Sequence, residues 1–172
     1  MMEVKFIENR QRTKTQLVQI NDAHICFRNF RGEGNDFNKE GDRNFSIKIT
    51  DPEIAEALKN DVNEFGAGWN VKIRAGREDG DAPFMHLPVK LKYTDRSAPK
   101  VYLVSGNNTV ELTEATIDTL DHIDIDHCDI DIRPYDGESR FGPHRTAYLQ
   151  NIWVVQDLSR NRFASRLNNM ED

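Results

Sequence analysis

The sequence has few cysteines and no long run of apolar residues. Cys26 and Cys128 are its only two cysteines and no CxxC pair occurs, which excludes a disulfide framework and favours a reducing compartment. No stretch approaches the roughly 20 apolar residues that a membrane-spanning helix needs. The N-terminus, Met-Met-Glu-Val-Lys, lacks the apolar region of a signal peptide. These absences predict a cytoplasmic protein with two core thiols and no contact with a membrane.

Sequence signatures of catalysis are also missing. The chain contains no GxSxG, no GxxxxGK followed by Ser or Thr, and no GxGxxG that opens a helix after a strand. The glycines of the segment RGEGNDFNKEGD, Arg31 to Asp42, are not spaced like those of a phosphate-binding loop. They indicate a long surface loop instead. We therefore expect a protein that is not an enzyme and that uses no cofactor.

The composition is that of one charged globular domain. Hydrophobic residues make up 37% of the 172-residue chain and charged residues 30%, which predicts a modest core below a strongly solvated surface. The net charge is −6, from 23 Lys and Arg against 29 Asp and Glu. This surplus of acids argues at first against a nucleic-acid partner, whose phosphates favour a basic surface. The positions of the charges therefore matter more than their sum.

Alternating apolar and polar residues predict seven strands. The alternation is clearest where Phe45, Ile47 and Ile49 share one face, because successive side chains of a strand point to opposite sides. Residues 1–16 are expected to form an arm or a first irregular strand. The predicted strands are 17–30, with a break at Asn21-Asp22, and then 43–49, 69–74, 84–93, 100–104, 127–135 and 146–155.

Two helices are expected between these strands. Asp51 is a suitable N-cap, Pro52 suits the first helical position, and apolar residues recur at helical spacing as far as Phe65, before Gly66. A second, short helix is predicted near Thr113 from a hydrophobic staple. Helices inserted among strands, without a regular βαβ alternation, favour a mainly β protein built as a small antiparallel barrel or sandwich.

No internal repeat or second domain is visible in the sequence. Residues 1–157 are therefore predicted to form a single domain, followed by a C-terminal tail over 158–172. Trp69 and Trp153 fall in the apolar phase of their strands and are expected in the core. The same is expected of Phe27, Phe30 and Phe45.

Cations and tyrosines recur on the polar face of the predicted strands, whereas the acids lie in loops, on helices and in the run from Asp118 to Asp131. A chain with a negative net charge can thus present one basic side with aromatic rings. On such a side, cations follow the phosphates of a single nucleic-acid strand and rings stack on its bases. The alternative is that these cations are only solvated and discourage edge-to-edge aggregation. The predicted nucleic-acid-binding residues are Lys48, Lys72, Arg74, Lys90, Lys92, Lys100, Tyr102, Arg133 and Tyr135.

The segment DHIDIDHCDID, Asp121 to Asp131, contains the residue types of a metal site. In a strand, Asp129 would point outward with His127 while Cys128 pointed inward, so the side chains would not converge on one ion. We therefore predict no metal site in this segment.

Four segments together resemble a known family. They are FRNFRGEGNDFNKEGDRNFSIKITDPEIAEAL, GWNVKIR, APKVYLVSGN and DIDIRPYD. In their order and wording they resemble a phage-encoded family of single-stranded DNA-binding proteins, over about Phe27 to Val155. The resemblance implies an OB-fold-like antiparallel β-barrel with one inserted helix. It also implies binding to the single strand that is displaced during phage DNA replication or recombination, in the host cell cytoplasm.

The resemblance also concerns partners. Single-stranded DNA is the expected ligand, and phage replication or recombination proteins and a second copy in a homodimer are further partners left open. Related binding proteins usually end in a strongly acidic tail that recruits partners, whereas here Arg160, Arg162 and Arg166 precede only Glu171 and Asp172. Recruitment through the C-terminus is therefore not expected.

Two other functions stay open from the sequence. One is a metal-dependent nuclease or phosphoesterase that uses the Asp121–Asp131 cluster. The other is a phage structural or adaptor protein, which would show no affinity for DNA.

Overall fold

The computed structural model describes residues 1–9, 15–94 and 96–159, which form a mainly β protein with one α-helix. The α-helix is α1 (Pro52–Asn60), and a short 3₁₀ helix is η1 (Ile117–Asp121). The strands are β1 (Glu3–Glu8), β2 (Thr15–Ala23), β3 (Ile25–Asn29), β4 (Arg43–Ile49), β5 (Lys72–Arg74), β6 (Phe84–Leu91), β7 (Lys100–Ser105), β8 (Asn108–Leu112), β9 (Ile125–Ser139) and β10 (Gly142–Gln156).

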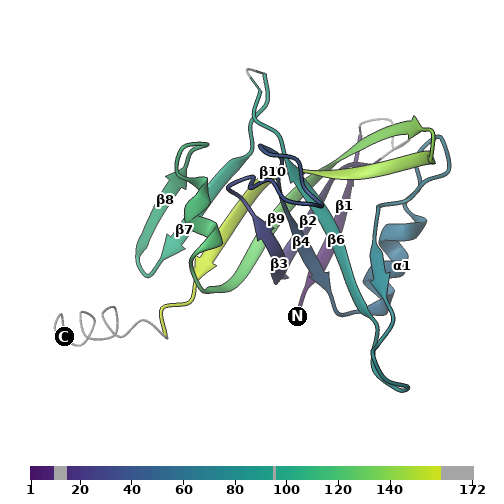
Figure 1. Ribbon diagram of the computed structural model, residues 1–172, viewed down its shortest axis with the longest axis horizontal. Helices are drawn as coiled ribbons and strands as arrows, with labels where there is room; N and C mark the ends of the chain where they lie inside the picture. The colour runs from purple at the N-terminus through teal and green to yellow at the C-terminus, as the bar shows by residue number, and fades with distance from the viewer. Residues whose placement is uncertain (10–14, 95, 160–172) are drawn as a thin grey trace.

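Strands β9 and β10 form a long hairpin that organises the sheet. In Figure 1 they cross the molecule, with α1 near the right-hand end and the β7–β8 hairpin at the left-hand end. The strands follow the order β1-β2-β9-β10-β6-β4-β3, with β5 beside β6 and β8 beside β7. The first half of β10 pairs with β6 and its second half with β7, in both cases parallel. The expectation of a purely antiparallel sheet is wrong for these two pairs, because crossovers and not hairpin turns connect them to β10.

Strands β2 and β3 are separated only by His24, and they pair with different neighbours. β2 pairs with β9, whereas β3 pairs with β4, and the amide of Lys48 on β4 donates to the carbonyl of His24 at 2.8 Å. Asp22 has a φ of 54°, and its amide donates to the carboxylate of Asp129 at 2.9 Å. Strand β2 does not end at Asn21-Asp22 as predicted, but its pairing with β9 is irregular there. The irregularity and the division at His24 let one stretch of chain pair first with β9 and then with β4.

The inward side chains of the strands form one apolar core. They include Phe45, Ile47, Leu87, Val89, Ile130, Ile132 and Ile152, each at most 1% exposed. Burying a side chain of this kind contributes roughly 1.5–3 kcal/mol. The period-two alternation predicted for 43–49, 84–93 and 127–135 is confirmed by this pattern.

The predicted positions of the aromatic residues are only partly confirmed. Phe30, Phe45 and Trp69 are buried, at no more than 2% exposure. Trp153 is 37% exposed, so its predicted place in the core is wrong. A bulge between Leu149 and Asn151 explains the difference, because one extra residue reverses which later side chains of a strand face the core.

Helix α1 begins where the sequence predicts but ends earlier. The carboxylate of Asp51 accepts a hydrogen bond from the amide of Glu53 at 2.9 Å, and proline occupies the first turn. The helix ends at Asn60, and the carboxylate of Asp61 then accepts hydrogen bonds from two side chains of neighbouring segments, each at 2.8 Å. Phe65, which was expected on the buried face of the helix, is 42% exposed.

The remaining elements differ from the prediction in smaller ways. The first segment contains a regular strand, β1, and strand β8 was not expected. The second helix is the 3₁₀ helix η1, which begins at Ile117 rather than near Thr113. Residues 160–172 of the tail that was predicted over 158–172, and residues 10–14 of the predicted N-terminal arm, lie outside the described residues. Within the described ranges no helix is long and apolar enough to cross a membrane.

Candidate nucleic-acid interface

The outer side of β4 and β6 carries polar side chains. The core occupies the inward positions of both strands, so the alternate residues face outward. In the antiparallel ladder Asn44 lies opposite Lys90, and Lys48 lies opposite His86. Both lysines are exposed, whereas His86 is 8% exposed. Two of the predicted binding cations therefore share this side of the sheet.

Strand β5 extends the same outer side by one strand. It pairs antiparallel with β6 and places Lys72 opposite His86 and Arg74 opposite Phe84. Both cations are exposed. Four cations from three neighbouring strands thus face outward together.

An exposed phenylalanine on β3 completes this surface. Phe27 has a φ of 51°, and the register of β3 shifts at this point, so its ring turns away from the core and is 54% exposed. Its centre lies 5.9 Å from that of Phe84 and 5.1 Å from that of His86, in edge-to-face arrangements. The guanidinium of Arg74 lies 5.7 Å from the centre of the same ring. We call Phe27, Lys72, Arg74, Phe84 and His86 the aromatic–cation cluster.

The surroundings of His86 are buried and positively charged, and both features affect its pKa. Its Nδ1 lies 2.9 Å from the hydroxyl oxygen of Ser46. Burial lowers the pKa of His86, and the nearby charges of Arg74 and Lys72 lower it further. A positive potential that disfavours a protonated histidine favours an anion at the same place.

The outer side continues across β10 to β9. Tyr148 lies between Lys90 on β6 and Arg133 on β9 in the two ladders. The guanidinium of Arg133 lies 5.3 Å from the centre of the Tyr148 ring, and the ring of Tyr135 meets the same ring edge-on at 5.5 Å. The predicted residues Arg133 and Tyr135 are therefore joined to Lys90 through a tyrosine that the sequence analysis did not select.

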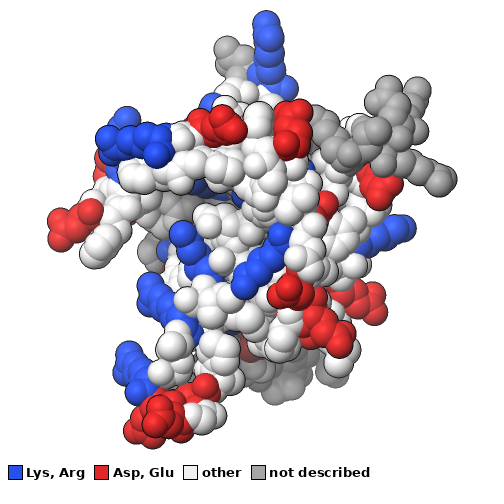
Figure 2. All heavy atoms as spheres, turned by 90° about the vertical axis from the view of Figure 1, so that its right-hand side faces the viewer, with Lys and Arg blue, Asp and Glu red and all other residues white. Residues whose placement is uncertain are grey.

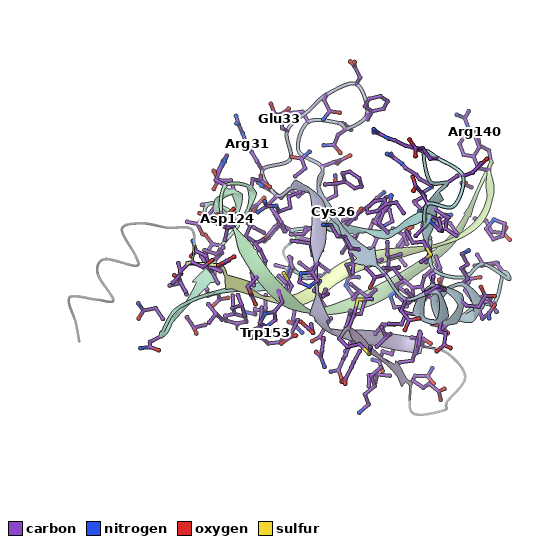
Figure 3. The ribbon with its side chains drawn as sticks, turned by 90° about the horizontal axis from the view of Figure 1, so that it is seen from below. Cys26, Arg31, Glu33, Asp124, Arg140 and Trp153 are labelled. Atoms are coloured by element: carbon purple, nitrogen blue, oxygen red, sulfur yellow. The ribbon has the colours of Figure 1, made fainter. Side chains whose placement is uncertain are left out.

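Lys100 and Tyr102 do not join this group. They lie on β7, which pairs with β10 beyond the part that pairs with β6. Lys100 forms an ion pair with Glu111 at 3.6 Å, and the ring of Tyr102 stacks on that of Trp153 at 5.7 Å. Trp153 and Arg31 lie on opposite sides of the molecule in Figure 3.

Two projections flank the outer side. In Figure 3 the β3–β4 loop, marked by Arg31 and Glu33, and the tip of the β9–β10 hairpin, marked by Arg140, rise on the same side of the molecule. Beside this loop is a hollow of about 560 Å³ whose lining includes Lys90 and Lys92. Lys92 thus lies past the end of β6, where the outer side meets the loop.

The acids are segregated from these cations in part. Figure 2 looks at the right-hand side of Figure 1 and shows Lys and Arg side chains following one another through its left half. Asp and Glu gather mainly at the lower tip and on the right, with smaller groups at the top and at the left edge. Segregation of this kind lets a molecule with a net charge of −6 present a locally positive surface.

The acidic run Asp121–Asp131 has structural partners. The carboxylate of Asp121 accepts hydrogen bonds from the amides of Phe30 and Arg31, both at 2.8 Å, and Asp131 accepts one from the side chain of Asn151 at 3.0 Å. Among residues 1–9, 15–94 and 96–159, no group of three His, Cys, Asp or Glu side chains could hold a metal ion.

The two thiols differ in their surroundings. Burial raises the pKa of Cys128 to about 12, as is usual for a core thiol. Cys26 is only half-buried, on the outward side of β3 opposite Ser46, and burial raises its pKa as well.

Sequence reasoning missed four members of the outer side for different reasons. Phe84, His86 and Tyr148 stand in the polar phase of their strands, so their phase was a usable signal. Phe27 gave no such signal, because a backbone irregularity and not the alternation turns its ring outward.

The chain is similar in fold to known proteins and matches one family model. No curated protein matches the chain. Among solved structures, the single-stranded DNA-binding protein from bacteriophage Enc34 is similar, with a TM-score of 0.49, 12% identity, and 93% of this chain and 95% of that chain covered. Its complex with ssDNA gives a TM-score of 0.46 and 14% identity over 89% of this chain and 96% of that one. A family model matches residues 8–171, and the chain belongs to that family, described as "Putative phage ssDNA-binding domain".

Proposed function

We propose that this protein binds single-stranded DNA, without cleaving it, along the outer side of β3, β4, β5, β6 and the adjoining halves of β9 and β10. The observation that carries the proposal is the aromatic–cation cluster, in which Arg74 covers the exposed ring of Phe27 beside Phe84. We call the proposed surface the binding face. It consists of Phe27, Lys48, Lys72, Arg74, Phe84, His86, Lys90, Arg133, Tyr135 and Tyr148.

The chemistry of the binding face suits a single strand. Lysine and arginine attract phosphates, and an aromatic ring stacks on any base at roughly 1–3 kcal/mol per base, so the combination binds without regard to sequence. Duplex DNA hides the faces of its bases inside the helix. Rings on an open surface therefore favour an unpaired strand.

We further propose that the fold is an OB-type barrel. Two features support this: β2 and β3 form nearly one strand that pairs with β9 on one side and β4 on the other, and β6 runs parallel to β10. The sheet order is open, from β1 at one end to β3 at the other, so the proposed barrel is a partly open one. It would place the binding face across the middle strands, between the β3–β4 loop and the β9–β10 hairpin. OB-folds use their sheet face and flanking loops to bind oligonucleotides.

The proposed role is protection of single strands during phage DNA replication and recombination. A nuclease would need free carboxylates that converge on a metal ion, whereas Asp121 accepts two backbone hydrogen bonds and Asp129 accepts one. Labelled DNA incubated with the pure protein and Mg²⁺ or Mn²⁺ is expected to stay intact. Cleavage that a chelator abolishes would overturn the non-catalytic proposal.

Charge reversal on the binding face tests the proposal directly. Lys72→Glu combined with Lys90→Glu is expected to weaken binding of oligo-dT by about tenfold or more at low salt. Each lost phosphate contact reduces the number of counterions that binding releases, and this release contributes to the affinity. Fluorescence anisotropy at two ionic strengths measures both the affinity and its dependence on salt. That dependence should be shallower in the variant.

Lys100→Glu is the matched control, since it is the same substitution on a strand outside the binding face. It is expected to keep nearly the wild-type affinity. Equal losses in the control and in the double variant, or no loss in either, would reject this surface as the site.

A further inference from the structure

The hollow beside the β3–β4 loop combines features of a nucleotide site. Its volume is about 560 Å³, within the range of about 300 to 1,000 Å³ usual for small-molecule sites. Phe37, Tyr93 and Tyr148 line it together with Lys90 and Lys92. Rings and cations therefore surround one space at the end of the binding face.

The side chain of Phe37 in the β3–β4 loop is exposed to solvent, although hydrogen bonds within the loop fix its backbone. The side-chain amide of Asn38 donates to the carbonyl of Glu33 at 2.9 Å and to that of Asp42 at 3.0 Å. The amide of Phe37 donates to the side chain of Asn35 at 2.8 Å. The ring of Phe37 is nevertheless fully exposed, so the backbone is ordered around an apolar side chain that has nothing to pack on.

The floor of the hollow belongs to the sheet. Tyr148 stands on β10, where Arg133 lies over its ring at 5.3 Å. An aromatic ring with an arginine next to it is a usual platform for a nucleobase.

The charges around the hollow favour a phosphate near its mouth. Lys90 and Lys92 are exposed, and within the described part of the chain neither forms an ion pair. Two acids belong to the lining. The carboxylate of Glu114 lies 4.0 Å from the guanidinium of Arg43, and the backbone carbonyl of Asp42 accepts a hydrogen bond from the side chain of Asn38 within the loop. Tyr93 adds a buried hydroxyl that has no hydrogen-bond partner among the described residues, and such groups are uncommon without a ligand or water.

We infer that this hollow takes one nucleotide of the bound strand, with its base held between Phe37 and Tyr148 and its phosphate at Lys90 and Lys92. The inference rests on the proposed binding of single-stranded DNA and adds a defined subsite to it. Only an unpaired base can enter the hollow. Binding at the subsite therefore requires a base, whereas the remaining cations of the binding face contact only phosphates.

A comparison of two ligands tests this subsite. Oligo-dT is compared with an oligomer of the same length that has abasic spacers in place of its nucleosides, so both carry the same phosphates. Phe37→Ala is expected to weaken binding of oligo-dT about fivefold or more, the loss of one stacked base, and to leave binding of the abasic oligomer unchanged. Phe37 is fully exposed, so this variant should fold like the wild type.

A double-mutant cycle tests whether the two rings hold the same base. Tyr148→Leu keeps apolar bulk at a half-buried position. If one base lies between the rings, the variant with both changes should bind oligo-dT no more than about twofold more weakly than the weaker single variant, because the two changes remove one interaction. Phe37→Ala combined with Phe27→Ala is the control pair, whose losses should multiply.

The outcomes separate the subsite from the general function. Suppose that the wild type binds oligo-dT and that Phe37→Ala lowers the affinity for oligo-dT and for the abasic oligomer equally, or lowers neither affinity. The subsite then does not exist, while the proposed function stands. If the losses of affinity caused by Phe37→Ala and Tyr148→Leu multiply in the double variant, the two rings do not hold the same base. If the wild type binds no oligo-dT at all, the proposed function fails with it. If Tyr148→Leu does not fold, the comparison of the two ligands with Phe37→Ala decides alone.

Discussion

The guanidinium of Arg74 lies 5.7 Å from the centre of the Phe27 ring, although β5 and β3 are not neighbours in the sheet. Both side chains reach across the outer side of β4 and β6 to meet. The contact stabilises the exposed ring by roughly 0.5–1 kcal/mol, as is usual for a cation near an aromatic face at the surface. It also places a cation against an exposed aromatic ring, and these are the two kinds of group that the proposed binding of phosphates and bases requires.

The backbone conformation at Phe27 allows the proposed binding role of its ring to be separated from the effect of this residue on stability. Phe27→Ala and Phe27→Gly should both weaken binding of oligo-dT by about fivefold or more, because both remove the stacking ring. Their stabilities should differ, since φ is 51° at this position and alanine retains the cost of the left-handed region, roughly 1 kcal/mol, whereas glycine does not. Urea unfolding and anisotropy on the same two samples measure both effects. Equal stabilities would show that φ at this position carries no cost.

Much of the sheet could be predicted from the sequence, because regular alternation decides which side chains are buried. Phe45 and Ile47 follow the period of two and lie in the core as expected. The same rule placed Lys48 and Lys90 outward, and they do face outward together. Where a strand is regular, the polar phase identifies the outer side.

The rule fails where the backbone is irregular or where pairing depends on distant strands. The bulge before Trp153 and the positive φ of Phe27 each turn a ring outward that alternation places inside. Lys100 and Tyr102 show the second limit: their phase is polar, but the pairing of β7 with the far half of β10 separates them from Lys90. No local pattern in the sequence encodes that separation.

His86 gives the protein a dependence of stability on pH. Burial and the charges of Arg74 and Lys72 lower its pKa below the ordinary value of 6.5, so the unfolded chain binds a proton at this residue more readily than the folded one. The contribution of His86 to the unfolding free energy is therefore fully present above pH 6.5 and is lost as the pH falls below that value. Urea unfolding at a series of pH values from 8 to 5.5, followed by tryptophan fluorescence, measures it.

Two variants isolate this effect from that of the other titrating groups. His86→Gln should lose less stability than the wild type over the same fall in pH. Lys72→Ala should lie between the two, because it removes one of the charges that oppose protonation while Lys48 and Arg74 remain nearby. Identical pH profiles for the wild type and His86→Gln would contradict the assignment.

Arg145 is buried at the junction of β10 with the segment after α1, and removing one of its partners should be costly. The residue is 1% exposed. Its Nε donates to the carboxylate of Asp136 at 2.8 Å, and its Nη1 lies 3.0 Å from the carboxylate of Asp61. Asp136→Ala leaves a buried charge with less compensation and should lower the unfolding free energy by roughly 3–5 kcal/mol.

The size of that loss depends on the buried charge and not on the carboxylate alone. Arg145→Met combined with Asp136→Ala should therefore be less destabilised than Asp136→Ala, because the buried charge that has lost one of its two carboxylate partners has been removed as well. Asp126→Ala is the matched control: its side chain is 61% exposed beside His127, and its loss should stay within about 0.5 kcal/mol. Urea unfolding compares all three with the wild type. A double variant that is at least as unstable as Asp136→Ala would mean that Arg145 stabilises the junction through its contact with Trp69, 5.5 Å from the ring centre, more than through its charge.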